Sequence, residues 1–159
     1  MTEAARHRAA AIGRIPSGLF IVTAGRDETA TAMLASWIQQ CAFHPPSITV
    51  ALKPDRPIVP LLSIGTPFVV NILDESQTDL VSLFGRGSRS GEQLLATIEL
   101  EPHPEGVPVL AEALAYLDCR VTASYPVGDH QLFVGEVIAG RARGVRPPLV
   151  HLRKSGAHY

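Results

Sequence analysis

Short β-branched runs, each bounded by turn residues, are the feature that most restricts the fold of this chain. The runs "GLFIVTA", "SITVALK" and "FVVNIL" are rich in Val, Ile and Phe, and Gly, Pro, Asp or Ser residues flank them, which is typical of strands. Two longer runs, "ALAYLDCRVTASYPV" and "HQLFVGEVIAGRARG", are separated by Gly128-Asp129, a dipeptide that favours a hairpin turn. No strand–helix–strand rhythm links these runs, so we do not expect a parallel sheet.

Further strands follow from the same reasoning. The stretch "TATAMLASWIQQCAF" is predicted to be one strand, which "HPP" stops because proline lacks the ladder donor. A last strand and a tail are expected in "PPLVHLRKSGAHY". Six or seven strands of even length, with few and short helices, predict a mainly β fold built as an antiparallel barrel.

Three short helices are expected around these strands. "TEAARHRAAAIGRI" opens with Thr2 as a cap, and "RPIVPLLSIG" places Pro57 at a first helical position. "SQTDLVSLFG" is predicted to be capped by Ser76 and ended by Gly85, and "GRGSRSGEQ" to form a mobile loop. No linker or break in composition divides the chain, so residues 1–159 are expected to form one domain.

Composition excludes several classes of function. Of the 159 residues, 46% are hydrophobic and 18% are charged, which indicates a globular protein, and the net charge of −1 argues against a nucleic acid or an anionic membrane as partner. There is no apolar run of about 18 residues and no secretory signal, so a cytoplasmic protein is expected. Cys41 and Cys119 lie in apolar runs and are expected to be buried, reduced thiols.

The familiar signatures of nucleophilic, metal and phosphate chemistry do not occur. The chain has no GxSxG, HExxH, CxxC, Walker or GxGxxG motif, and its six histidines are scattered. We therefore expect neither a metal site nor a Rossmann cofactor site.

What remains is a set of polar residues at or inside the strand ends: Ser36, Gln39, Gln40, Lys53, Arg56, Asn71 and Gln77. Each has a structural alternative, since Asn71 could serve a backbone group, Lys53 could be a solvated strand end and Gln77 could belong to a cap. Together they favour a pocket for a planar polar heterocycle that carries a phosphate. Amides and hydroxyls would contact the ring edges, while Lys53 and Arg56 would hold the anion.

Several segments, in this order, resemble the flavin reductase family: "GLFIVTA", "MLASWIQQCAFHPPSITVAL", "FVVNIL", "ALAYLDCRV", "GDHQLFVGEV" and "HLRKSGAHY". The chain looks most similar to the flavin-reductase-like C-terminal module of flavodiiron proteins, from about Ile12 to Tyr159. The resemblance implies the FMN-binding split barrel, a homodimer with flavin near the subunit interface, and NADH or NADPH as hydride donor to FMN or FAD.

The resemblance also implies the site residues. His130 would lie near the flavin and the nicotinamide, with Asp129 orienting or charging it; a turn with a solvated imidazole is the alternative for this pair. Arg86 and Arg89 are expected to be solvated rather than to contact a phosphate. The remaining cofactor-binding residues would be Leu34, Ser36, Trp37, Cys41, Ala42 and Phe43 around the ring, Lys53 and Arg56 at the phosphate, and Asn71, Gln77 and Phe84 in the pocket.

Two departures limit the resemblance. Many stand-alone reductases carry a Thr-x-Asn-Ser run where this chain has Leu34, Ser36, Trp37 and Gln40, so the preference for FMN or FAD could differ. The chain is also too short for the metal-bearing and flavodoxin-like domains of flavodiiron proteins, so oxygen reduction at a di-iron centre is not expected. The main hypothesis is an NAD(P)H-dependent flavin reductase that could serve a partner oxygenase. A non-enzymatic FMN-binding electron-transfer module and a small β-barrel that binds another ligand or a protein are the alternatives.

Overall fold

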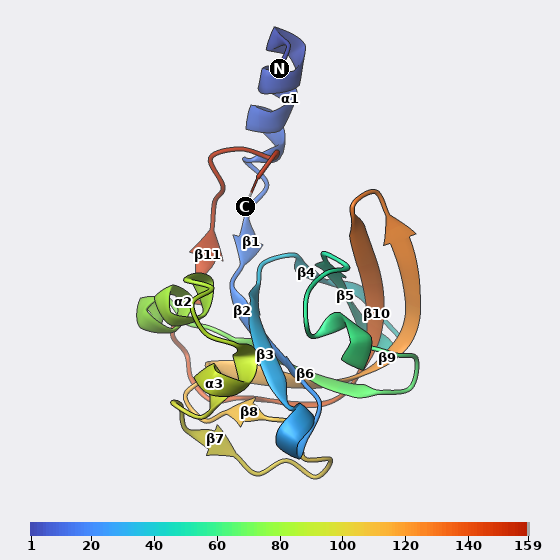
Figure 1. Ribbon diagram of the computed structural model, residues 1–159, viewed down its shortest axis with the longest axis vertical. Helices are drawn as coiled ribbons and strands as arrows, with labels where there is room; N and C mark the ends of the chain where they lie inside the picture. Colours follow the sequence, from blue (N-terminus) through green and yellow to red (C-terminus); the bar gives the residue numbers. More distant parts are fainter. Residues whose placement is uncertain (159) are drawn as a thin grey trace.

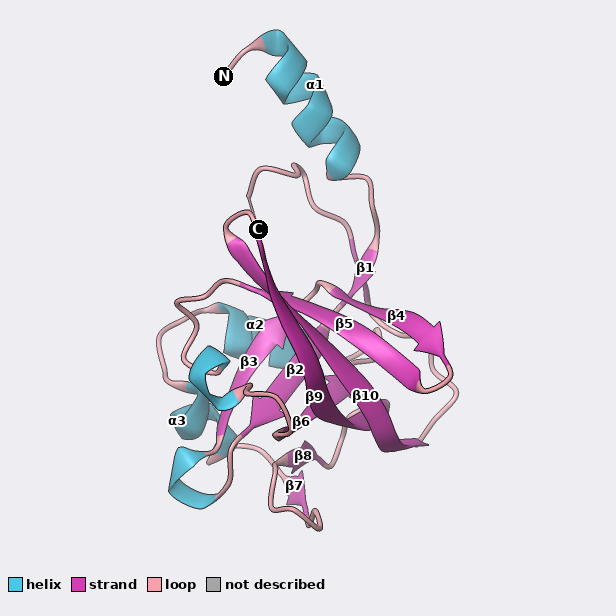
Figure 2. Ribbon diagram, turned by 90° about the vertical axis from the view of Figure 1, so that its right-hand side faces the viewer, coloured by secondary structure: helices cyan, strands magenta, loops and turns pink. Residues whose placement is uncertain are grey.

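Seven antiparallel strands form the central sheet of the computed structural model, which describes residues 1–158 (Figure 1). Their spatial order is β3-β2-β6-β9-β10-β5-β4. The bounds are β2 Phe20–Ala24, β3 Thr31–Ala35, β4 Ile38–Phe43, β5 Pro46–Leu52, β6 Pro67–Ile72, β9 Ala115–Val127 and β10 His130–Ala142. The sheet curls so that β5, β9 and β10 face β2, β3 and β6 across the core (Figure 2). The mainly β, antiparallel fold class is therefore confirmed.

Two short ladders complete the strands. β1 (Ser17–Gly18) pairs with β11 (Val150–His151), and β7 (Leu100–Glu101) pairs with β8 (Val109–Leu110). The first ladder joins the two ends of the chain to each other beside the barrel (Figure 1). Tyr159, the last residue of the family resemblance, lies outside the described residues.

The hairpin of β9 and β10 confirms the turn that was expected at Gly128-Asp129. Val127 pairs with His130, so only these two residues connect the strands, and Gly128 has φ = +57°. A positive φ is accessible to glycine at little cost. Further along β10, a Cβ at position 135 would lie 2.5 Å from the Phe68 ring, so Gly135 allows that ring to pack against the strand.

The predicted strand over residues 29–43 is in fact two strands at opposite edges of the sheet. β3 pairs with β2, whereas β4 pairs with β5, and the chain passes between them at Ser36 and Trp37. The two halves have different partners, so the backbone cannot remain one continuous strand. His44-Pro45, a cis peptide, follows β4 before the chain enters β5.

The helices agree with the sequence in part. α1 (Glu3–Ile12) begins as expected, with Thr2 Oγ1 accepting a hydrogen bond from the Ala5 amide at 3.2 Å. The prediction of a helix that begins at Pro57 is wrong, because only a single 3₁₀ turn, Val59–Leu61, forms. Two prolines in this short segment remove amide donors, which limits helix extension.

The second half of the helix predictions also needs correction. α2 spans Thr78–Gly85 and Gln77 is its N-cap residue, so the expected Ser76 cap is wrong; Ser76 instead donates to Asp74 Oδ1 at 2.5 Å. The predicted loop around residues 85–93 contains the start of α3 (Gly91–Leu95). Ser90 and Gln93 form a capping box there, a signal hidden in a Gly/Ser-rich stretch.

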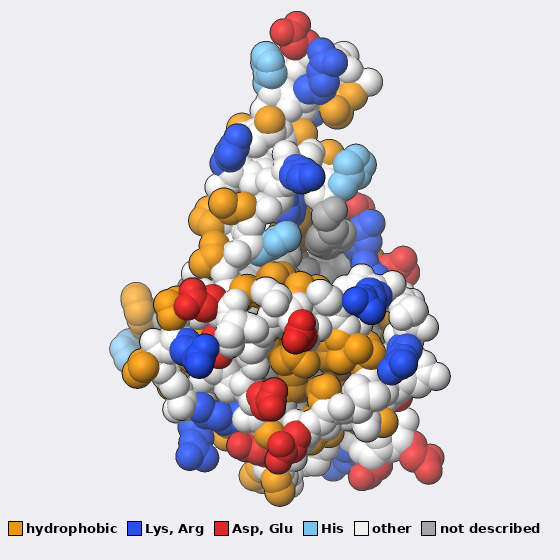
Figure 3. Space-filling model, turned by 90° about the vertical axis from the view of Figure 1, so that its left-hand side faces the viewer, with side chains coloured by type: hydrophobic (Ala, Val, Ile, Leu, Met, Phe, Trp, Pro, Cys, Tyr) orange, Lys and Arg blue, Asp and Glu red, His pale blue; other side chains and the backbone are white. Residues whose placement is uncertain are grey.

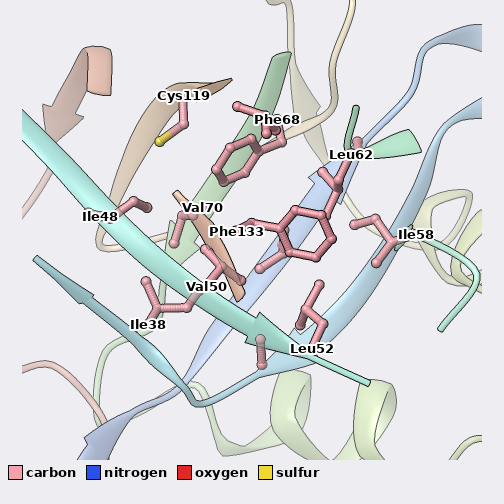
Figure 4. Packing of buried hydrophobic residues seen from close by; sticks show 14 residues of the cluster. Ile38, Ile48, Val50, Leu52, Ile58, Leu62, Phe68, Val70, Cys119 and Phe133 are labelled. Atoms are coloured by element: carbon pink, nitrogen blue, oxygen red, sulfur yellow. The ribbon is translucent and has the colours of Figure 1, made fainter. Parts of the chain in front are cut away.

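The core fills the barrel and the space beneath α2 and α3. Inside the barrel, Phe68 from β6 and Phe133 from β10 point toward Val50 and Leu52 of β5 (Figure 4). Cys119 is buried as expected, and burial raises the pKa of its thiol to about 12. The same expectation for Cys41 is wrong, because this residue is exposed in β4 next to a register shift.

α1 projects from the barrel and meets the C-terminal segment at its base (Figures 1 and 2). The Gly156 amide donates to the Ala9 carbonyl at 2.6 Å, which ties the two ends of the chain together. On the face that carries α2 and α3, charges of both signs surround a hydrophobic patch (Figure 3). Within residues 1–158, no helix has the length and apolar character needed to cross a membrane.

Candidate flavin site

A cavity of about 550 Å³ lies beside β3, one of the two edge strands of the sheet. Because β3 pairs only with β2 among residues 1–158, its other side leaves backbone amides and carbonyls without a strand partner there. The end of β5, the turn after it, α2 and α3 form the other walls. The apolar part of the lining includes Leu19, Met33, Leu34, Leu52, Ile58, Val81, Phe84 and Leu94.

Three cationic side chains line the cavity: Lys53, Arg56 and Arg89. Lys53 directly follows β5, and the Arg56 amide donates to the Lys53 carbonyl at 3.2 Å, so one turn presents both side chains. Arg89 comes from the α2–α3 connection. A hollow with apolar walls and several cations suits a flat ligand with an anionic group.

The break between β3 and β4 sets the position of Trp37. Its carbonyl accepts a hydrogen bond from the Ala51 amide at 3.0 Å, which fastens the break to β5. Ser36 and Trp37 both line the cavity as a result. The interruption that separates the two strands thus also supplies part of the cavity wall.

The wall formed by α3 depends on Gly91. A Cβ at this position would lie 2.2 Å from Thr31 Oγ1 and 2.5 Å from both the amide nitrogen and the carbonyl oxygen of Ala32. Backbone atoms cannot move aside as a flexible side chain can, so only glycine permits this approach of α3 to β3. Ser90 and Gly91 both line the cavity.

His130 lies behind Trp37 at the start of β10. Its ring centroid is 4.8 Å from that of Trp37, at an interplanar angle of 40°. The side chain is largely buried, and Nδ1 lies 2.7 Å from Oδ1 of the exposed Asp129. The hydrogen bond from His130 is the main cause of a lowered pKa of the Asp129 carboxyl, and the Lys53 charge contributes in the same direction. His130 itself is not a lining residue; it contacts the cavity wall through Trp37.

The structure brings some of the predicted site residues together and separates others. Those in the cavity lining are Leu34, Ser36, Trp37, Lys53, Arg56 and Phe84. Cys41, Ala42 and Phe43 lie on the outer part of β4, and Phe43 is 79% exposed. These three residues do not line this cavity.

Asn71 and Gln77 also lie outside the cavity lining. Asn71 is fully buried; its Nδ2 donates to the Ile21 carbonyl and its Oδ1 accepts from the Leu110 amide, both at 2.9 Å. Gln77 Nε2 donates to the Glu112 carbonyl at 2.8 Å, and its Oε1 accepts from the Asp74 amide at 2.9 Å. Both side chains thus serve backbone groups, which is the structural alternative that the sequence left open for Asn71. The alternative for Gln77 was part of a cap; Gln77 is the N-cap residue of α2, but its side chain makes no cap hydrogen bond.

Sequence reasoning missed lining residues on other segments. Arg89, expected to be solvated, lines the cavity, whereas Arg86 does not. His151 also lines it, because the pairing of β11 with β1 brings the C-terminal segment alongside. That pairing spans almost the whole chain and leaves no local signal, although "HLRKSG" was part of the resemblance.

The chain belongs to the family described as the flavin reductase like domain, whose model matches residues 12–157. This confirms the predicted resemblance. Among its relatives, the chain is 40% identical over 151 residues to diflavin flavoprotein A 1 of Synechocystis sp., a match that covers 94% of this chain and 26% of that protein. The chain therefore spans about a quarter of the length of the curated relatives it matches.

Solved structures agree with this assignment. The NADH:FAD oxidoreductase SgcE6 of Streptomyces globisporus C-1027, in complex with NAD and FAD fragments, superposes with a TM-score of 0.80 at 26% identity, over 92% of this chain and 86% of SgcE6. BorF, the flavin reductase component of a bacterial two-component tryptophan halogenase, gives a TM-score of 0.80 at 25% identity, over 92% of this chain and 91% of BorF.

Proposed function

We propose that this chain is an NAD(P)H-dependent flavin reductase that binds FMN or FAD in the cavity beside β3. The observation that carries the proposal is the cavity itself, in which an open strand edge, apolar walls and three cations meet. The family and the structure of SgcE6 with NAD and FAD fragments support the same conclusion.

The residues present fit a flavin. The backbone of β3 and the Ser36 hydroxyl would hydrogen bond to the polar edge of the ring, and Leu34, Trp37 and Phe84 would contact its faces. Lys53 and Arg56, on one turn, would hold the phosphate, together with Arg89 from the α2–α3 connection. Arginine can bind a phosphate through two parallel hydrogen bonds.

A bound flavin would supply the redox chemistry: it would take a hydride from the reduced nicotinamide and a proton from water, which leaves oxidised nicotinamide and reduced flavin. The protein's own contribution is to bind, to orient and to exclude water. We propose that His130, held by Asp129 and packed on Trp37, fixes the ring of Trp37 at the place where the nicotinamide must approach. In this role His130 and Asp129 are positioning residues.

We further propose a homodimer and a cytoplasmic location, where nicotinamide dinucleotides are available. Cys41 and Phe43 are exposed, Ala42 is half-buried, and all three lie outside the cavity of their own chain. If these residues contact a flavin, we propose that it is the flavin bound by a second subunit. Asn71 and Gln77 are proposed to support the strands behind the cavity instead of touching the flavin.

We consider two proposals for the acceptor of the electrons. BorF is a reductase component of a two-component system, which supports delivery of reduced flavin to a partner oxygenase. The match to about a quarter of a diflavin flavoprotein favours a second candidate, an FMN-binding module that passes electrons onward and has no nicotinamide site of its own. Turnover of NADH or NADPH with free flavin would separate the reductase from this module.

Flavin titration tests the binding part directly. Trp37 is the only tryptophan of the chain and lines the cavity, so its emission reports on occupancy. Arg56→Gln should weaken FMN binding by about tenfold or more, because it removes a charge-assisted contact. The exposed Arg141 on β10 provides a matched control, and Arg141→Gln should bind FMN like the wild type. Equal affinities of all three proteins would contradict the proposed phosphate contact.

A further inference from the structure

The C-terminal segment after β11 lies alongside the cavity at a fixed place. Val150 and His151 pair with Gly18 and Ser17 of β1, so the backbone of this segment is anchored. The side chain of His151 lines the cavity. Two residues later, Arg153 reaches Trp37, with its guanidinium carbon 4.9 Å from the centroid of the indole ring.

Arg153 offers hydrogen-bond donors that an anion could use. Arg153 is partly exposed, and among residues 1–158 no carboxylate forms an ion pair with the Arg153 guanidinium. A guanidinium held over an aromatic ring is attracted through its charge, and the N–H groups around its rim stay directed outward. The Trp37 ring thus orients this cation beside the cavity without occupying its donors.

The proposed reaction involves a second anionic ligand besides the flavin. The flavin phosphate would face Lys53, Arg56 and Arg89, which line the cavity, whereas Arg153 lies against the ring of Trp37 and is not a lining residue. Trp37 also contacts His130, the residue proposed to mark the nicotinamide's approach. Because Arg153 lies outside the cavity lining, it is placed for the co-substrate that approaches past Trp37 and not for the flavin phosphate inside the cavity.

We propose that Arg153 binds the pyrophosphate of the nicotinamide dinucleotide, an inference that rests on the proposed reductase function. The planar fork of arginine matches two phosphate oxygens at once, which a lysine ammonium does not. The pyrophosphate is common to NADH and NADPH, so Arg153 contributes equally to the binding of both nucleotides. The anchoring of β11 to β1 gives the fork a defined position from which to act.

The test uses three variants of the full chain. Arg153→Gln removes the charge, Arg153→Lys keeps the charge but not the fork, and Lys154→Gln removes a charge from the neighbouring exposed residue. For each protein we would measure the FMN affinity through Trp37 emission, and then kcat and KM with NADH and with NADPH at two salt concentrations. A melting curve checks that each variant is folded.

Arg153→Gln should raise KM about tenfold for both nucleotides, the loss expected for one charge-assisted phosphate contact. Its kcat and FMN affinity should stay close to the wild-type values, because uniform binding is lost and the chemical step is untouched. KM should also become less sensitive to salt. Arg153→Lys should lie between wild type and Arg153→Gln, and Lys154→Gln should match the wild type.

Three results would overturn the proposal. An unchanged KM in Arg153→Gln would show that Arg153 does not contact the nucleotide. A parallel loss of FMN affinity and kcat shows that Arg153 only supports Trp37. A rise in KM confined to NADPH assigns the contact to the 2′-phosphate instead. If the wild type binds no flavin or oxidises neither nucleotide, the proposed function itself fails and the inference fails with it.

Discussion

Replacing Asn71 by alanine would test whether this residue holds the fold together or contacts the cofactor. Asn71 lies on β6 with no exposed surface, and its side chain bridges the carbonyl of Ile21 on β2 and the amide of Leu110 on β8. No other part of the sheet can replace these two contacts without moving. Asn71→Ala therefore removes the acceptor of the buried Leu110 amide and one donor to the Ile21 carbonyl, which keeps its place in the ladders of β2.

The expected destabilisation is large. An unsatisfied buried amide costs about 1–3 kcal/mol and the lost bond to the Ile21 carbonyl about 0.5–1.5 kcal/mol, so the free energy of unfolding falls by about 2–4 kcal/mol. A domain of this kind is stable by only about 5–15 kcal/mol, so the shift is a considerable part of the total. The carboxamide itself does not line the cavity, so the folded variant should bind flavin nearly as well as the wild type.

Urea unfolding measures the first quantity and flavin titration under folding conditions the second. Thr122→Ala is the matched control, because Thr122 Oγ1 also donates to a backbone carbonyl, that of Val134, but at an exposed position. It should change stability by less than about 0.5 kcal/mol. If Asn71→Ala had nearly normal stability but bound flavin poorly, Asn71 would be a cofactor residue and the structural account would be wrong.

Three further predictions concern the cavity wall and the His130–Asp129 pair that supports it. Gly91→Ala should lower the melting temperature and weaken flavin binding together, since its Cβ would meet the Thr31 hydroxyl and the β3 backbone; a variant that kept full affinity would show that α3 can withdraw freely. Saturation with FMN should quench most of the Trp37 emission, and unaltered emission of the flavin-bound protein would place the flavin elsewhere. His130→Ala should reduce turnover with the fold intact, and NMR titration should show the pKa of the Asp129 carboxyl rising toward its ordinary value, because the main cause of its lowering is removed. Since that pKa is lowered in the folded state, the pair stabilises the protein at neutral pH and loses this contribution below about pH 4. An unmoved Asp129 titration would contradict the pairing.

Local patterns predict the strands well and the contacts between distant segments poorly. The β9–β10 hairpin follows from strand composition on either side of Gly128-Asp129, and both partners are neighbours in sequence. The break at Ser36 and Trp37 could not be predicted from propensity, because it arises when β3 and β4 join opposite edges of the sheet. α3 was missed for a different reason, since its Gly/Ser-rich start conceals the capping box at Ser90.

The candidate site shows the same division. One continuous motif predicted six ring contacts, of which Leu34, Ser36 and Trp37 line the cavity and Cys41, Ala42 and Phe43 do not. Asn71 looked like a pocket residue because a polar side chain interrupts an apolar strand, yet only the three-dimensional neighbours show that it serves the backbone. His151 was missed because its place depends on pairing between the two ends of the chain.

Reduction of the bound flavin under anaerobic conditions tests the central claim most directly. The purified protein, loaded with FMN and freed of excess flavin, would be mixed with NADH or NADPH while the visible flavin absorbance is followed. We predict rapid bleaching by at least one of the two nucleotides, in stoichiometric proportion to bound FMN. If the protein binds FMN but keeps its full flavin absorbance with both nucleotides, the proposed reductase function is contradicted. The electron-transfer module would then be the function that fits.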